Sequence, residues 1–216
     1  KLGLRTTGME FASEMVIKAT IKGLRITQIP IILYKDGRAR PPHLRSWHDG
    51  WRHLRFMLMY SPRWLFLIPG FLLFSLSFIF FILLEFSPIR IGSVVFDTNT
   101  LLVFAMAILL GFQLISFSIY TKTFAITEGL LPDDPIFKRL CRLLTLEVGI
   151  LVGLCFSIVG FWLITYGVFI WWKVGFGSLL SPGSLRVTVP GITMAVLGIQ
   201  IIFSSFFLSI LCLSRK

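Results

Sequence analysis

The sequence contains few charged residues for its length. Asp, Glu, Lys and Arg together account for 14% of its 216 residues, whereas soluble domains average about 25%. This shortage argues against a soluble globular domain, and also against a disordered chain, whose solvation depends on charge. Apolar residues reach 56% and include 22 phenylalanines. We therefore expect a membrane protein.

Cysteine and histidine are also scarce. The three cysteines have no CxxC spacing and two lie in apolar runs, so we predict packed or lipid-facing thiols. The three histidines are five residues apart, a spacing that turns each by about 140° from the last on a helix. They cannot share one face, and we predict no metal site in this chain. These six residues are Cys141, Cys155, Cys212, His43, His48 and His53.

Four long runs of the sequence carry no charge. Each reaches the length of about 20 residues that an apolar helix needs to cross a bilayer. We predict transmembrane helices at Trp64–Leu84, Thr98–Thr121, Val148–Trp172 and Val187–Ser214. The fold class is therefore a mainly α-helical, multi-span membrane protein. Small residues in the runs would let the helices approach closely.

The basic residues predict the orientation of these spans. If the N-terminal region is cytoplasmic, the inside segments 1–63, 122–147 and 215–216 hold 18 of the 21 Lys and Arg. The outside segments 85–97 and 173–186 hold the other three. Because cytoplasmic loops carry the excess of Lys and Arg, we expect a multi-pass protein of the cytoplasmic membrane with both termini inside. A basic patch can also bind nucleic acid, but no nucleic-acid motif is present, and we predict no such partner.

Residues 1–43 are predicted to be the C-terminal fragment of an α/β domain. A helix is expected from an N-cap at Thr7 to about Lys22, and residues 25–34 have the composition of an edge strand interrupted by a proline. One helix and one strand bury too little apolar surface to be stable alone. We therefore expect a partner domain upstream of Lys1.

Residues 44–60 are predicted to form an amphipathic helix that lies in the membrane interface. Trp and Leu recur on one face and Arg on the other, which is the pattern of interfacial helices. The helix leads into the transmembrane domain, residues 61–216, and a second short interfacial helix is expected over 136–144. The predicted interface contacts are Trp47, Trp51, Leu54 and Trp64.

A basic loop precedes this helix and is a candidate phosphate-binding site. Arg38, Arg40, His43 and Arg45 fall within eight residues shaped by Gly and Pro. The planar guanidinium of Arg binds phosphate oxygens bidentately. The alternative is non-specific attraction to anionic lipid, worth about 1 kcal/mol per basic residue. The residues alone leave both readings open.

Two carboxylates are candidates for acid–base chemistry. Glu10 and Glu14 lie four residues apart, and paired carboxylates can serve as acid and base. The structural alternative is that Glu10 caps its helix and that Glu14 forms an i,i+4 ion pair with Lys18. The few polar groups deep in the spans, Gln113 and Gln200, argue against a proton or ion pathway.

Several stretches of the chain resemble a known family. The sequence is similar to the C-terminal part of bacterial membrane glycosyltransferases of family 2, which resemble dolichol-phosphate mannose synthase and other polyprenyl-phosphate glycosyltransferases. The resemblance covers the whole chain and is most specific in the first 55 residues. It is carried by Gly8–Met15, Ile26–Ile31, Asp36–Arg40, His43–Arg55, Phe124–Pro132 and Thr145–Gly149.

The resemblance implies an enzyme that works at the cytoplasmic face of the membrane. A GT-A catalytic domain would bind a nucleotide sugar with Mg or Mn at a DxD motif and transfer the sugar to a polyprenyl phosphate. The loop with Arg38, Arg40 and Arg45 would approach the donor diphosphate or the lipid phosphate. This chain has neither the nucleotide-binding unit nor the DxD motif, so we expect no cofactor of its own and no activity alone.

Two other functions remain as alternatives. The chain could be a non-enzymatic anchor or accessory protein that binds anionic lipid or a partner protein. A transporter is less well supported, because the spans contain almost no charge. The expected partners are a polyprenyl-phosphate lipid, membrane lipid, a nucleotide sugar through the missing domain, and a possible second copy of the chain.

Overall fold

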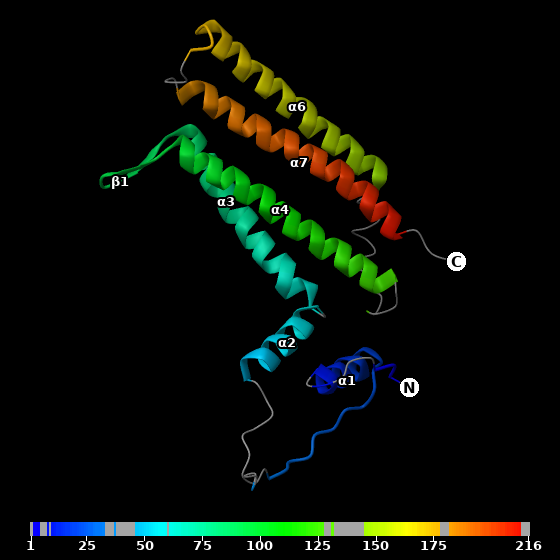
Figure 1. The fold of residues 1–216 in the computed structure, drawn as a ribbon. Helices are drawn as coiled ribbons and strands as arrows, with labels where there is room; N and C mark the ends of the chain where they lie inside the picture. Colours follow the sequence, from blue (N-terminus) through cyan, green and yellow to red (C-terminus); the bar gives the residue numbers. More distant parts are fainter. Residues whose placement is uncertain are drawn as a thin grey trace. The chain divides into compact units, whose positions relative to one another are not determined.

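The structure is a computed structural model that describes residues 2–4, 8, 10–32, 37, 46–59, 61–127, 131, 145–177 and 182–212 (Figure 1). The chain divides into two compact units, Lys1–Leu65 and Phe66–Lys216. The described elements are α1 (Glu10–Ile21), α2 (Ser46–Met59), a π-helical turn η1 (Arg63–Leu67), α3 (Ile68–Phe86), β1 (Ile89–Ile91), β2 (Val94–Phe96), α4 (Thr98–Thr127), α6 (Leu146–Lys173) and α7 (Pro182–Cys212).

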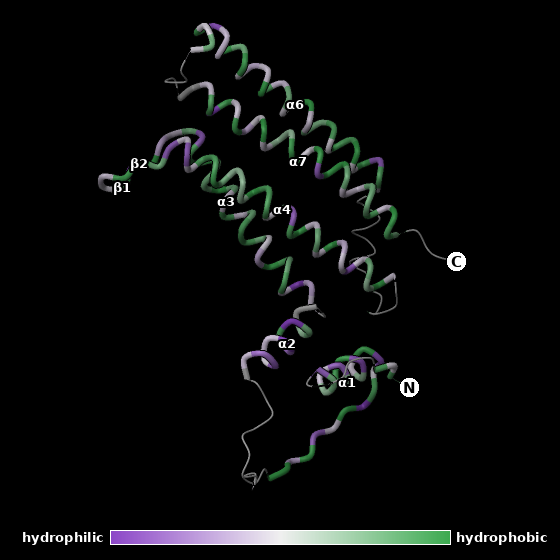
Figure 2. Tube along the Cα trace, viewed as in Figure 1, coloured by the Kyte–Doolittle hydropathy of each residue, from purple (hydrophilic) through white to green (hydrophobic). Residues whose placement is uncertain are grey.

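The four predicted transmembrane helices are confirmed. Helices long and apolar enough to cross a membrane cover Arg63–Phe86, Thr98–Thr127, Leu146–Lys173 and Ser184–Cys212. Figure 2 shows that apolar residues run along all four of them. The helices extend past the charge-free runs, because a helix can continue through a charged residue near the membrane surface. The first span therefore includes Glu85.

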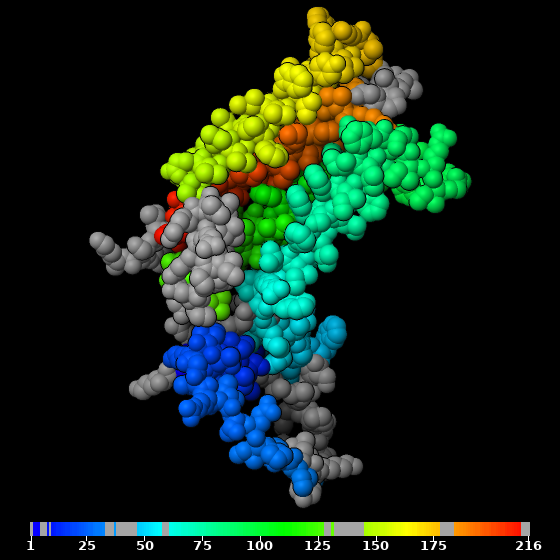
Figure 3. Space-filling view, turned by 180° about the vertical axis from the view of Figure 1, so that it is seen from behind, coloured from blue at the N-terminus to red at the C-terminus, as the bar shows by residue number. Residues whose placement is uncertain are grey.

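The second unit is built from two antiparallel helix pairs. Helix α3 packs on α4, α6 packs on α7, and α4 and α7 form the seam between the pairs. Figures 1 and 3 both show α6 lying beside α7. Buried apolar side chains of α3, α4 and α7 form its core: Phe81, Leu84, Leu101, Ala105, Ile108 and Val189. Most other large apolar side chains are exposed, as expected for helices that face lipid.

Glycines allow both pairs to pack closely. A Cβ added at Gly111 of α4 would lie 2.6 Å from the backbone nitrogen of Phe74 in α3. A Cβ at Gly160 of α6 would lie 2.4 Å from the backbone nitrogen of Ala195 in α7. The predicted role of small residues in helix contact is confirmed at both positions.

Two features of this unit differ from the sequence prediction. Residues 89–96 form a two-stranded antiparallel hairpin with Gly92 at its turn, where the sequence suggested only a loop. The last helix was expected to begin at Val187, but α7 begins at Pro182, so Pro190 lies well inside the helix. Because proline has no N–H, it cannot donate the helical hydrogen bond to the carbonyl of Arg186.

The first unit contains α1 and α2, whose bounds agree closely with those of the two helices predicted for it. Helix α1 ends before Gly23, whose φ of 64° suits a residue without a side chain. The predicted edge strand is wrong for residues 25–32, which form no strand. A strand is defined by hydrogen bonds to a neighbour, and the described part of this unit offers no strand for it to pair with. The N-cap expected at Thr7 lies outside the described residues.

Candidate functional site

An ion pair joins α1 to α2. Arg52 of α2 donates hydrogen bonds from Nε to Oε1 of Glu10 over 3.0 Å and from Nη2 to Oε2 over 3.3 Å. Glu10 is buried, and its pKa is lowered from the usual 4.5, first by its own backbone N–H and, against the effect of burial, by Arg52. The carboxylate is therefore held in its charged form.

A second polar contact lies beside this ion pair. Ser13 of α1 and His53 of α2 lie within hydrogen-bond distance, with 3.3 Å between Oγ and Nε2. The other ring nitrogen of His53, Nδ1, is buried and has no hydrogen-bond partner in the described part of the chain. The two contacts together fix one face of α1 against α2.

Glu14 is also engaged in an ion pair. Its Oε1 lies 2.6 Å from Nζ of Lys18, one turn further along α1. The predicted i,i+4 pair is thus confirmed, and Glu14 is almost completely buried. Glu10 and Glu14 both have structural partners, and a catalytic role for either stays a prediction.

The four residues predicted to contact the membrane interface are exposed. Trp47 is 88% exposed, Trp51 57% and Leu54 48% on α2, and Trp64 in η1 is 67% exposed. Large apolar side chains with this much free surface on an amphipathic helix are the type that insert between lipid headgroups. Their contact with lipid remains a prediction.

The predicted phosphate-binding residues lie outside the described part of the chain. Arg38, Arg40, His43 and Arg45 are all in this category, and so is the short helix expected over 136–144. Their roles stay predictions based on the sequence. Among the described residues, no group of three or more His, Cys, Asp or Glu could hold a metal ion.

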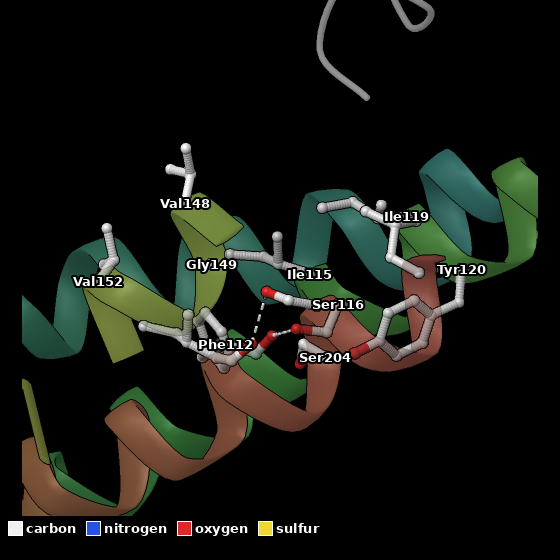
Figure 4. A pocket seen from close by; sticks show the side chains of 12 residues that line it. Phe112, Ile115, Ser116, Ile119, Tyr120, Val148, Gly149, Val152 and Ser204 are labelled. Carbon is white, nitrogen blue, oxygen red and sulfur yellow. Dashed lines mark hydrogen bonds between the residues drawn. The ribbon is translucent and has the colours of Figure 1, made fainter. Parts of the chain in front are cut away.

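An apolar pocket lies at one end of the four-helix unit, where α4 ends, α6 begins and α7 ends. This α4–α6–α7 pocket has a volume of about 290 Å³. Figure 4 shows that side chains of all three helices line it. The hydroxyls of Ser116 and Ser205 donate to carbonyls of their own helices. They still have lone pairs to accept a hydrogen bond, so the pocket suits an apolar chain with an occasional polar group.

Three charged residues that were not predicted to form a site meet at the opposite end of the unit. Arg186 of α7 donates from Nη2 to Oδ1 of Asp97 over 2.7 Å. This hydrogen bond lowers the pKa of Asp97. Arg186 also lines a cavity together with Glu85 of α3. A possible signal was that Arg186 is one of only three basic residues in the predicted outside segments.

Four apolar helices that can each cross a bilayer define a multi-pass membrane protein. Residues 119–212 match the model of the C-terminal transmembrane region of glycosyltransferase family 2. The chain is also 34% identical over 209 residues to the low-salt glycan biosynthesis hexosyltransferase Agl6 of Haloferax volcanii. The chain is therefore similar to the C-terminal membrane part of family 2 glycosyltransferases.

The similarity to this relative covers only part of the relative's length. The alignment covers 94% of this chain but 48% of the relative, so the chain spans about half the length of the curated relative it matches. No solved structure matches the chain. The resemblance found in the sequence is confirmed at the level of the family, and the bacterial origin stays a prediction.

Proposed function

We propose that this chain is the membrane half of an enzyme that transfers a sugar from a nucleotide donor to a polyprenyl phosphate at the cytoplasmic face of the membrane. The observation that carries the proposal is the pair Arg52–Glu10. It ties α1, which would belong to the catalytic part, to an amphipathic helix whose apolar face is exposed. A catalytic domain attached in this way would work at the level of the lipid headgroups.

The α4–α6–α7 pocket supports a lipid acceptor. By chain order, it lies at the end of the second unit where α3 begins. The isoprenoid chain of the acceptor would enter this pocket, while its phosphate stays at the surface. The basic residues Arg38, Arg40, His43 and Arg45 would bind that phosphate or the donor diphosphate. Mg or Mn would bind in the catalytic domain.

The proposal is tested by sugar transfer to polyprenyl phosphate in neutral detergent, with the whole enzyme. Substitution of Arg38, Arg40 or Arg45 by Ala should remove a charge-assisted hydrogen bond worth about 1.5–3 kcal/mol. This corresponds to a rate loss of about tenfold or more, because each 1.36 kcal/mol is about tenfold. Lys at the same positions should restore only part of the rate, because it keeps the charge and loses the planar fork.

Arg25→Ala serves as the matched control, because Arg25 is exposed and lies outside the basic loop. It should leave the rate unchanged. Wild-type rates in all three loop variants would instead make the loop a contact with anionic lipid. Absence of transfer by the wild-type enzyme, with every nucleotide sugar supplied, would favour a non-enzymatic anchor.

A further inference from the structure

A large apolar cavity opens between the two helix pairs. It has a volume of about 670 Å³, which lies within the range of about 300–1,000 Å³ typical of ligand pockets. All four long helices line it, because α3 and α6 are both packed against the central helices but not against each other. Its apolar lining includes Phe78, Phe81, Ile108, Phe156, Leu163 and Met194.

One end of this cavity is polar. Glu85 and Arg186 line it, and Arg186 is bound to Asp97. Oε2 of Glu85 is buried and has no hydrogen-bond partner among the described residues. Pro190, which also lines the cavity, has no N–H to offer the carbonyl of Arg186. The guanidinium has five N–H donors, and its bond to Asp97 uses Nη2, so others can reach a ligand.

The charges at this end define the ligand that fits. The Glu85 carboxylate accepts hydrogen bonds and the Arg186 guanidinium donates them, while Asp97 holds the guanidinium from outside the lining. A suitable head group therefore carries an anionic group for Arg186 and several O–H donors for the carboxylate oxygens. A sugar joined to phosphate has this combination on one chain, whereas an aminophospholipid joins its phosphate to one ammonium, has no sugar hydroxyls and carries two acyl chains. A single long hydrocarbon chain would fill the apolar remainder of the cavity.

We propose that this cavity binds a glycosylated lipid phosphate, with its hydrocarbon chain among the phenylalanines, its phosphate on Arg186 and its sugar hydroxyls on Glu85. The inference rests on the proposed function, because this lipid is its product. The cavity extends to the end where α3 ends and α7 begins, opposite the α4–α6–α7 pocket. The site would therefore hold the product on the membrane face away from its synthesis. A reaction that consumes it there would transfer the sugar from the lipid phosphate to an acceptor on that face.

The test uses a polyprenyl-phosphate hexose with a photoreactive diazirine in its chain, added to the whole protein in neutral detergent. Crosslinks should map to the helix segments 74–85 and 186–197. Glu85→Gln and Arg186→Gln should each raise the half-saturating probe concentration at these segments about tenfold or more. Arg90→Gln is the matched control, because Arg90 is exposed on β1 at the same end, and it should change nothing.

Two further probes make the result specific. A sugar-free polyprenyl phosphate with the same diazirine should lose affinity in Arg186→Gln but not in Glu85→Gln. Unlabelled phosphatidylethanolamine should compete poorly. Equal labelling of wild type and both variants, or full competition by phosphatidylethanolamine, would overturn the proposal.

Crosslinks to residues 112–120 monitor the fold of each variant, because these residues line the other pocket and should be labelled equally in every variant. Sugar transfer by the wild-type enzyme is measured in parallel. Absent transfer refutes the proposed function, whereas unchanged labelling in the two variants refutes this site. The two failures are therefore distinguishable.

Discussion

Arg52 binds both carboxylate oxygens of Glu10, at 3.0 and 3.3 Å. The two residues are 42 positions apart in the sequence, and their contact joins α1 to α2. The planar guanidinium fits a carboxylate bidentately, which fixes direction as well as charge. α1 has few other contacts with α2. The attachment of α1 to the amphipathic helix therefore depends strongly on this pair.

Replacing Arg52 should release α1. In Arg52→Gln the charge is lost, and in Arg52→Lys the bidentate geometry is lost, so we expect faster amide exchange across residues 10–21 in both, with Gln the more severe. Hydrogen–deuterium exchange of the full chain in detergent measures this. Arg25→Gln changes an exposed arginine without a contact to α1 in the described structure and should have no effect. Equal protection in all four proteins would contradict the prediction.

Acidification should have the same effect on α1. Because the folded-state pKa of Glu10 is lowered from 4.5, its charged form stabilises the α1–α2 contact above that pH. The stabilisation should be lost as the pH falls below 4.5 through the folded-state pKa. Hydrogen–deuterium exchange of the wild type should show this loss when it is measured at several pH values. The labelling times are scaled to correct for the pH dependence of the intrinsic amide exchange rate. Arg52→Gln should have a weaker pH dependence.

A methyl group at Gly160 should weaken the α6–α7 pair. The added Cβ would meet backbone atoms of α7 that cannot move aside easily, and overpacking of this kind costs about 1–3 kcal/mol. Unfolding of Gly160→Ala in mixed micelles should show that loss. Gly50 of α2 is the contrasting position, since a Cβ there meets nothing within 4 Å. Gly50→Ala should be stabilising, by about 0.5–1 kcal/mol.

The side chains of Gln113 and Gln200 should be energetically coupled. Nε2 of Gln200 donates to Oε1 of Gln113 over 3.3 Å, between α4 and α7. Hydrogen bonds between transmembrane helices contribute about 0.6 kcal/mol on average and up to about 1.7. A double-mutant cycle with Gln113→Leu and Gln200→Leu should give a coupling free energy in this range. Strictly additive effects would show that the bond contributes nothing.

The orientation of the spans can be tested with reporter fusions. The distribution of Lys and Arg predicts that fusions at Ser93 and Ser178 report outside. Fusions at Asp133 and after Lys216 should report inside. A cytoplasmic reporter at Ser178 would reverse the predicted topology of the second helix pair.

Local features of this protein were predictable from the sequence because their causes are local. The i,i+4 pair Glu14–Lys18 follows from helix geometry alone, and the structure has it. The amphipathic pattern likewise predicted a helix where α2 is found. The hairpin at residues 89–96 was missed, because its strands are only three residues long and too short for a clear alternation.

The membrane class, the four spans and the resemblance to family 2 glycosyltransferases were predictable from the sequence alone. A helix that crosses a bilayer must be long and uncharged, and the motifs that carry the resemblance are contiguous stretches. Only the tertiary structure decided which polar residues meet. Arg52 with Glu10 and Arg186 with Asp97 are separated by 42 and 89 residues. No periodicity links positions so far apart, since their contact depends on how α1 packs on α2 and α7 on α4. The cavity between the helix pairs could not be predicted from the sequence for the same reason. Its lining comes from four helices, and which of them pack together is decided only when the chain folds.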